Sequence, residues 1–158
     1  MTVYARLAPI WITAAVLIFA PAAEAMIQID GGIAGARLGN TRGQVRAALG
    51  KPTKIRTSSN AFGRFVEYKF AGGIRVMFQG KTNVTAVETT GKGDRTLAGI
   101  GVGSAESSVQ ARVPGVKCEG VGSSRSCHTG DFVAGKTVTD FRIVSGKVTS
   151  VTVGIVID

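Results

Sequence analysis

The chain has 158 residues, with 19 Lys and Arg against 10 Asp and Glu, and a net charge of +9. This length excludes a large multidomain protein and predicts one compact domain with a hydrophobic core. The excess of positive charge predicts attraction to anionic surfaces. The basic residues are scattered, however, and no run of five occurs, which favours a solvated surface over a dedicated polyanion site.

The first 25 residues have the pattern of a secretory signal peptide. A segment with one positive charge, Arg6, precedes the apolar run LAPIWITAAVLIFA, and the triplet 23–25 has the small-residue pattern of a cleavage site. The apolar run is short for a transmembrane span, and no Cys follows it, which argues against a lipoprotein. We therefore expect residues 1–25 to be removed, with an uncleaved N-terminal anchor as the alternative. The mature protein is expected to be secreted or located in the periplasm or cell envelope.

Residues 26–34 are interpreted as an N-terminal lead-in, and the first predicted element after them is a short helix. Thr41 and Gln44 have the spacing of a capping box at its start. Val45 and Leu49 share one apolar face, and Gly50 can take the left-handed conformation that ends a helix. A helix of this length is marginal in water and must therefore pack on a sheet.

Three strands are predicted to follow this helix. Val66, Tyr68 and Phe70 alternate with polar or exposed positions in the segment FGRFVEYKF, and the segments IRVMFQ and VTAVETT are separated from it and from each other by the turns AGG and GKTN. This alternation predicts antiparallel hairpins with one buried face. We expect Tyr68, Phe70 and Phe78 to belong to the core.

The same order recurs 64 residues later. Ser104 lies where Asn40 lies in the first segment, and Val109 and Val113 take the positions of Val45 and Leu49. Near the C-terminus, VTSV at 148–151 matches VTAV at 84–87 at the same offset. The pattern predicts an α+β fold of two tandem repeats, 35–96 and 97–158. Each repeat would be a short helix followed by an antiparallel β-meander, packed into one body on a repeat-defining core of Val45, Leu49, Val109 and Val113.

The repeated segments GNTRGQVRAALGKP and GSAESSVQARVPGV, each followed by a predicted meander, resemble the SmpA/OmlA module of outer-membrane assembly proteins. Two such modules in an exported chain are similar to the beta-lactamase inhibitory proteins. The resemblance implies a scaffold for protein binding. The chain departs from both families, since residues 26–158 contain no Trp and one Tyr, and no lipobox Cys is present.

Cys118 and Cys127 are the two cysteines of the chain. In an exported protein this pair favours a disulfide that closes the segment EGVGSSRS. A redox or metal site would need a C-x-x-C motif or more ligands, so we predict no metal site.

Catalytic chemistry has little support in the sequence. The single histidine, His128, follows Cys127 in the segment CHTGD, which is interpreted as a solvated turn. The segment GIGVGS has glycine spacing similar to part of a phosphate loop, but no Lys follows it, so a tight turn before a helix is favoured. We therefore predict no catalytic residues, no cofactor and no enzymatic activity.

Two classes of function are compatible with these patterns. The first is a non-enzymatic protein-binding module, such as an inhibitor of an extracellular enzyme, for which Phe62, Phe65 and Met77 are the candidate contact residues. The alternative is a basic, envelope-associated structural protein held by charge to anionic cell-wall polymer or a membrane surface. A nucleic-acid partner is disfavoured, because the aromatic residues do not alternate with basic residues in a recognised pattern.

Overall fold

The computed structural model describes residues 26–80 and 82–157. The predicted signal peptide, residues 1–25, lies outside the described residues. Within the described part of the chain, no helix has both the length and the apolar character needed to cross a membrane.

The segment expected to be a lead-in contributes to a small antiparallel sheet. This sheet consists of β1 (Ile27–Gln28), β2 (Gly32–Ile33) and β3 (Ala36–Arg37), in the order β1-β2-β3. Ile27 and Ile33 are 2% and 1% exposed and belong to the core. The three strands therefore form part of the folded body.

Helix α1 (Arg42–Leu49) begins and ends as the sequence predicts. The Thr41 side chain accepts a hydrogen bond from the Gln44 backbone, and the Gln44 side chain accepts one from the Thr41 backbone, which confirms the capping box. Gly50 ends the helix with a positive φ. Val45 is fully buried, whereas Leu49 is only partly buried against the core.

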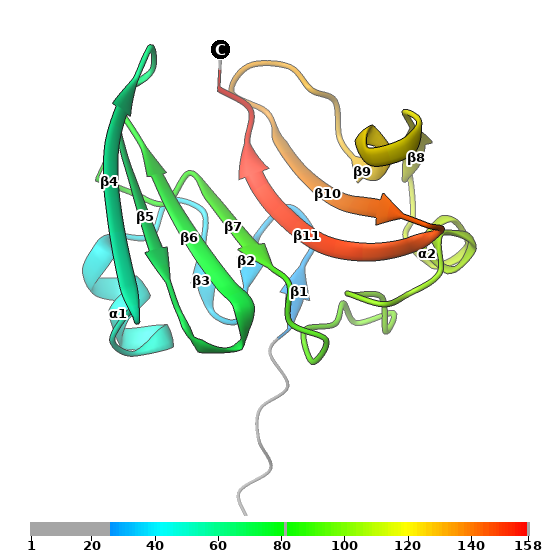
Figure 1. The fold of residues 1–158 in the computed structure, drawn as a ribbon, viewed down its shortest axis with the longest axis horizontal. Coiled ribbons are helices and arrows are strands. Elements are labelled where there is room, and N and C mark those ends of the chain that lie inside the picture. Colours follow the sequence, from blue (N-terminus) through cyan, green and yellow to red (C-terminus); the bar gives the residue numbers. More distant parts are fainter. Residues whose placement is uncertain (1–25, 81, 158) are drawn as a thin grey trace, which may run out of the picture.

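Eight strands form one large antiparallel sheet with the order β4-β5-β6-β7-β11-β10-β9-β8. Figure 1 shows it as a curved surface with β4 at one side, β8 at the other, and β7 beside β11 in the middle. The strands are β4 (Lys54–Asn60), β5 (Gly63–Lys69), β6 (Ile74–Gln79), β7 (Ala86–Thr89), β8 (Lys117–Glu119), β9 (Ser126–Thr129), β10 (Thr137–Val144) and β11 (Lys147–Ile155). Short 3₁₀ turns lie at Ala71–Gly73 and Gly122–Ser124.

The expected α+β fold of two tandem helix-plus-meander repeats is wrong. Strands are the dominant secondary structure of the described residues, and α-helices occur there only at α1 and α2 (Glu106–Arg112). Val87 of β7 lies opposite Val153 of β11, so strands from both halves of the chain belong to one sheet. Separate meanders would each leave an edge of unpaired backbone N–H and C=O groups, and this central pairing satisfies those groups.

Helix α2 lacks the side-chain cap of α1, and Ser104, at the position equivalent to Asn40, lies one residue before its N-cap. Its N-cap is Ala105, which provides no side-chain hydrogen bond. The Ser104 hydroxyl instead accepts hydrogen bonds from Arg95 and from the Gly101 backbone. Val109 is fully buried and Val113 is 5% exposed, so both contribute to the core as expected.

The core lies between the large sheet and the elements that cover one of its faces. Tyr68, Phe70 and Phe78 are 4%, 7% and 0% exposed, which confirms their prediction as core residues. The Tyr68 ring meets the Phe70 and Phe78 rings edge to face, with centroids 6.4 and 5.1 Å away. From the other half of the sheet, Phe141 is also fully buried.

Candidate functional site

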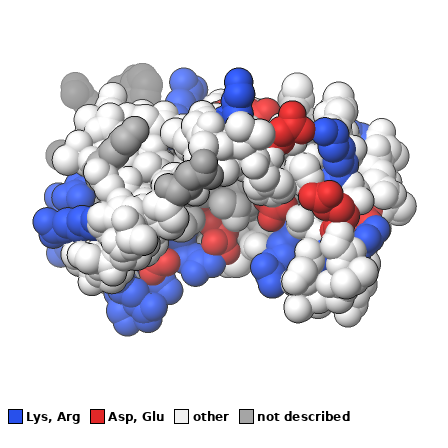
Figure 2. Space-filling view, turned by 90° about the horizontal axis from the view of Figure 1, so that it is seen from above, with Lys and Arg blue, Asp and Glu red and all other residues white. Residues whose placement is uncertain are grey.

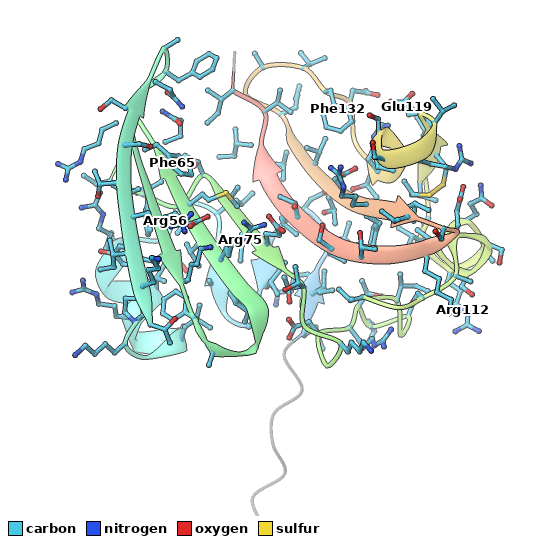
Figure 3. The ribbon with its side chains drawn as sticks, in the orientation of Figure 1. Arg56, Phe65, Arg75, Arg112, Glu119 and Phe132 are labelled. Atoms are coloured by element: carbon cyan, nitrogen blue, oxygen red, sulfur yellow. A yellow bond between two sulfur atoms is a disulfide. The ribbon has the colours of Figure 1, made fainter. Side chains whose placement is uncertain are left out.

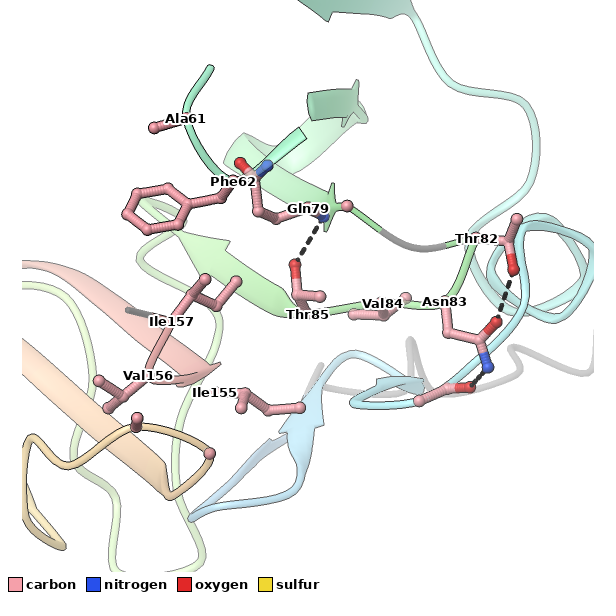
Figure 4. A pocket seen from close by; sticks show the side chains of 14 residues that line it. Ala61, Phe62, Gln79, Thr82, Asn83, Val84, Thr85, Ile155, Val156 and Ile157 are labelled. Atoms are coloured by element: carbon pink, nitrogen blue, oxygen red, sulfur yellow. Dashed lines mark hydrogen bonds between the residues drawn. The ribbon is translucent and has the colours of Figure 1, made fainter. Parts of the chain in front are cut away.

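A groove of about 990 Å³ lies where the central strands end. One side is formed by the tip of the β4–β5 hairpin and the segment after β6, and the other by the loop before β10 and the residues after β11. Figure 4 shows the groove, with Phe62 and Ile157 projecting from these two sides. The described lining consists of Gly39, Ala61, Phe62, Gln79, Gly80, Thr82, Asn83, Val84, Thr85, Ala134, Gly135, Ile155, Val156 and Ile157.

Backbone hydrogen bonds fix the first side of the groove. The Gly80 N–H donates to the Arg64 carbonyl at 2.8 Å, which joins the end of β6 to the β4–β5 hairpin. Gly80 has a φ of +61°, and a Cβ at this position would lie 2.7 Å from the Phe62 carbonyl oxygen. The close approach therefore requires glycine, and it holds the turn that carries Phe62 against β6.

The second side is held in a similar way. The Gly135 N–H donates to the Val156 carbonyl at 2.9 Å, and the Val156 N–H donates to the Lys136 carbonyl at 2.8 Å. The Ile155 N–H donates to the Thr85 carbonyl at 2.9 Å and joins the end of β11 to the groove floor. The C-terminal segment is therefore a positioned wall of the groove.

The polar groups of the groove are mostly satisfied within the protein. The Asn83 side chain donates to the Gly39 carbonyl at 2.9 Å and accepts from the Thr82 hydroxyl at 3.0 Å (Figure 4). The Thr85 hydroxyl accepts from the Gln79 backbone at 3.0 Å. In contrast, Phe62 and Ile157 leave 47% and 41% of their surface exposed. This arrangement favours binding of an apolar group.

None of the described lining residues is charged, although the chain carries a net charge of +9. The described lining therefore offers no carboxylate, imidazole or amine for general acid–base chemistry. The described lining consists of aromatic, aliphatic, amide, hydroxyl and backbone groups.

The three candidate contact residues lie in two places. Phe62 lies at the hairpin tip and lines the groove. Phe65 of β5, labelled in Figure 3, is partly buried. It and the partly buried Met77 of β6 lie on the face of the sheet opposite to the core face of Val66 and Phe78. The structure thus places Phe65 and Met77 on one face, since Phe65 pairs with Gln79, two residues from Met77.

The second side of the groove was not among the candidate contact residues expected from the sequence. Ile155, Val156 and Ile157 belong to the apolar segment GIVID, which in the sequence continues the last strand of the second expected repeat. Strand β11 ends at Ile155, so the next two residues extend past the sheet. The apolar segment continues past Ile155, which pairs with Thr137 at the start of β10. Apolar residues beyond the paired part of a strand are the sequence signal for this side of the groove.

The sheet face that carries Phe65 also carries a row of polar residues across all eight strands. Residues that lie directly opposite each other on neighbouring strands have their side chains on the same face of the sheet. The partner of each residue on the next strand can therefore be followed from one edge of the sheet to the other. In spatial order the row is Lys54, Lys69, Arg75, Glu88, Thr152, Asp140, His128 and Lys117. Seven of these eight residues have ionisable side chains, and the eighth is Thr152, so the row is polar from one edge of the sheet to the other.

Ion pairs hold part of this row. Glu67 is 8% exposed, and its oxygens lie 3.6 Å from Lys69 Nζ and 3.7 Å from Arg75 Nη1. Arg75 also donates a hydrogen bond to Glu88, and this bond is the main cause that raises the pKa of Arg75. Two carboxylates thus share Arg75, whose guanidinium stays charged at all relevant pH values.

His128 is not part of a solvated turn, as the sequence suggested. It lies on β9 and is 4% exposed. Its Nδ1 lies 3.1 Å from the Gly130 carbonyl oxygen, and its Nε2 lies 3.2 Å from Glu119 Oε1. The ring of Phe132 covers it at 4.6 Å between centroids (Figure 3 labels Phe132 and Glu119). The histidine is therefore held as a packed and hydrogen-bonded residue of the sheet.

Asp140 lies opposite His128 in the row, and its environment predicts a pH dependence of stability. Burial raises the pKa of Asp140, while a hydrogen bond with Ser126 and the charges of His128 and Arg142 oppose this rise. Its Oδ1 is buried and has no hydrogen-bond partner among the described residues. Deprotonation therefore costs more in the folded than in the unfolded state.

Replacing Asp140 with Asn is expected to stabilise the protein by about 1 kcal/mol at neutral pH, because the uncompensated carboxylate is removed. The ionised Asp140 carboxylate lowers the free energy of unfolding. This loss is absent below the pKa of about 3.9 that Asp has in the unfolded chain, and it grows as the pH rises through the higher pKa of Asp140 in the folded protein. The advantage of Asp140→Asn should therefore shrink toward acidic pH, as thermal melts at several pH values would measure.

Asp131→Asn is the matched control for this measurement. Lys117 donates to Asp131 at 2.8 Å and is the main cause that lowers the pKa of Asp131. This exposed pair should give the opposite and smaller trend, with a slight loss at neutral pH that disappears on acidification. Equal pH profiles for Asp140→Asn and the wild type would contradict the prediction.

The predicted disulfide between Cys118 and Cys127 is present and joins β8 to β9. It is consistent with a secreted protein, because such bonds persist in oxidising compartments. Ligand atoms of Glu106 and both cysteines lie within 4.8 Å of one another. The two sulfur atoms are bonded to each other and Arg125 binds both Glu106 oxygens, so this group does not provide a set of free metal ligands.

No protein-family model matches the chain, and no curated protein matches it. It has low similarity to several solved structures. The first is an extracellular protein containing an SCP domain from Bacillus anthracis, with 12% identity, a TM-score of 0.49, and coverage of 75% of this chain and 44% of that one. A cysteine-rich secretory protein from Staphylococcus aureus has 10% identity, a TM-score of 0.45, and the same coverages.

An uncharacterised Escherichia coli protein, yfeY, has 10% identity, a TM-score of 0.45, and coverage of 80% of this chain and 95% of that one. The chain spans less than half the length of the Bacillus anthracis and Staphylococcus aureus proteins. None of these three is described as an SmpA/OmlA module or a beta-lactamase inhibitory protein. We draw no functional conclusion from similarity of this size.

Proposed function

We propose that the protein is an exported, non-enzymatic protein-binding module that holds an apolar part of its partner in the groove between Phe62 and Ile157. The observation that carries this proposal is the pair of exposed apolar side chains on the two sides of an uncharged described lining. Exposed aromatic residues beside a preformed concavity are typical of binding sites. Inhibition of an extracellular enzyme is one role of such a module.

The rigidity of the groove supports the same proposal. Both sides are held by backbone hydrogen bonds, through Gly80 on one side and Val156 on the other. A surface that is ordered before binding loses little conformational entropy when the partner binds. The groove is therefore suited to specific binding by a limited number of contacts.

Charge supports a second candidate function, association with anionic cell-wall polymer or a membrane surface. Lys54, Lys69 and Arg75 lie directly opposite one another on three neighbouring strands. Glu67 and Glu88 compensate Lys69 and Arg75 in part, and the remaining positive charge on this face would attract an anionic partner. Binding through these residues alone should weaken strongly with salt.

The decisive experiment immobilises the protein of residues 26–158 and measures which exported proteins of the source organism it captures. Capture is compared at low salt and at about 1 M salt, where charge interactions are screened beyond about 3 Å. The wild type is compared with Phe62→Asp and with the control Leu97→Asp. Leu97 is 91% exposed and does not line the groove, so both variants add the same charge at an exposed apolar position.

We expect one partner to be retained at high salt by the wild type and by Leu97→Asp. Its capture should fall at least about tenfold with Phe62→Asp, as for a central interface residue. Equal capture by Phe62→Asp would contradict the groove as the site. Loss of all capture at high salt would favour the charge-based alternative.

A further inference from the structure

The two edges of the large sheet differ in length and exposure. Strand β8 ends one side with three residues and carries the disulfide. Strand β4 ends the other side with seven residues, all exposed, and pairs only with β5 among the described strands. Its register with β5 is unbroken from Lys54 to Asn60. A long, regular and uncovered edge can accept a further strand.

The backbone of β4 offers hydrogen-bonding groups at this edge. The hairpin closes at the pair Asn60 and Gly63 around a two-residue turn, and hydrogen-bonded pairs then recur at every second residue. By this alternation Ile55, Thr57 and Ser59 direct their N–H and C=O groups away from β5. No hydrogen bond within the described part of the chain uses these backbone groups.

A hollow beside the edge can receive a side chain of an added strand. It has a volume of about 450 Å³ and is lined by Arg46, Gly50, Lys51, Pro52 and Ile55. The Ile55 side chain is 48% exposed in it. Strand addition gains affinity from main-chain hydrogen bonds and specificity from such pockets for alternate side chains.

The charge of the protein is concentrated around β4. Residues 31–80 contain a single acidic residue, Glu67, which already lies near Lys69 and Arg75. The basic residues of this range are Arg37, Arg42, Arg46, Lys51, Lys54, Arg56, Arg64, Lys69 and Arg75. In Figure 2 large groups of basic side chains lie at the left end, where β4 lies in Figure 1, and most acidic side chains lie in the centre and right.

We propose that the free edge of β4 binds an extended, acidic segment of a partner protein by strand addition. Alternate side chains of the segment would face Lys54 and Arg56 on one face of the sheet and the hollow at Ile55 on the other. The same positive charges oppose pairing with a second copy, because each copy carries +9. The edge lies on the outer side of the hairpin, so this binding does not require the groove.

The probe is a short synthetic peptide that alternates glutamate and valine, titrated against the protein of residues 26–158 by fluorescence anisotropy. Thr57→Pro removes an outward N–H at an edge position where proline is tolerated, and Thr57→Ala keeps that N–H. We expect saturable binding that Thr57→Pro weakens at least tenfold and Thr57→Ala changes less than twofold. Thermal melts confirm that both variants are folded.

A second variant tests the charge requirement separately. Arg56→Glu reverses one charge on β4 without changing its backbone, and it should weaken the glutamate–valine peptide at least tenfold while a lysine–valine peptide gains affinity. Equal binding by Thr57→Pro and Thr57→Ala would overturn strand addition and leave charge attraction to a polyanion. No saturable binding, or dimerisation of the protein through β4 in sedimentation experiments, would also overturn the proposal.

Discussion

Replacing Phe78 with Ala is expected to lower the free energy of unfolding by about 3–5 kcal/mol, the usual range for a buried phenylalanine. Phe78 is fully buried on β6, and its ring meets that of Tyr68 edge to face. The guanidinium of Arg42 lies 5.3 Å from the ring centroid. The substitution therefore removes packing, an aromatic contact and a cation–π contact together.

Urea denaturation followed by circular dichroism would measure this loss. Because strands of both halves belong to one sheet, the variant should unfold in a single transition at a lower urea concentration. Phe62→Ala, which truncates a phenylalanine that is 47% exposed, is the matched control and should cost much less. Similar midpoints for both variants, or two separate transitions, would contradict the packing described.

Replacing Cys118 and Cys127 together with Ala should lower the free energy of unfolding by about 2–3 kcal/mol. The bond closes a loop with a sequence separation of nine residues, and the chain-entropy estimate for such a short loop lies in this range. Cys127 is also fully buried, so its side chain contributes packing in addition to the bond.

Thermal and urea unfolding of the double variant would measure this loss, and reduction of the wild type provides the control. Both treatments remove the bond and should destabilise the protein, and the double variant should lose somewhat more, because it also removes the buried sulfur of Cys127. Mass analysis that finds two free thiols in natively purified protein would contradict the disulfide. An unchanged unfolding midpoint after reduction would show that the bond adds no stability.

Local features of the fold follow from the sequence. Thr41 and Gln44 form the capping box that their spacing predicts, and Gly50 ends the helix. The alternation around Tyr68 and Phe78 identifies two strands and the face that each buries. These features depend on neighbouring residues and on a hydrophobic period of two or 3.6, so they can be inferred from a short window of sequence.

Strand β4 carries no such local signal. Its sequence KIRTSSN has no hydrophobic alternation, and all seven residues are exposed. It forms a strand because β5 offers a hydrogen-bonding edge next to it across a two-residue turn. Any sequence without proline can pair its backbone in this way. Backbone pairing with β5 is therefore sufficient for a strand here, although the side chains show no alternating pattern.

The caps of α1, the central strands with their buried faces, and the cysteine pair all follow from the sequence alone. The pairing of β7 with β11 depends on the tertiary fold. It joins the two expected units into one sheet and brings Phe62 opposite Ile157. Backbone groups are chemically alike along the chain, so they do not mark their distant partners in the sequence. The groove arises from that long-range pairing and from chain segments that continue past it.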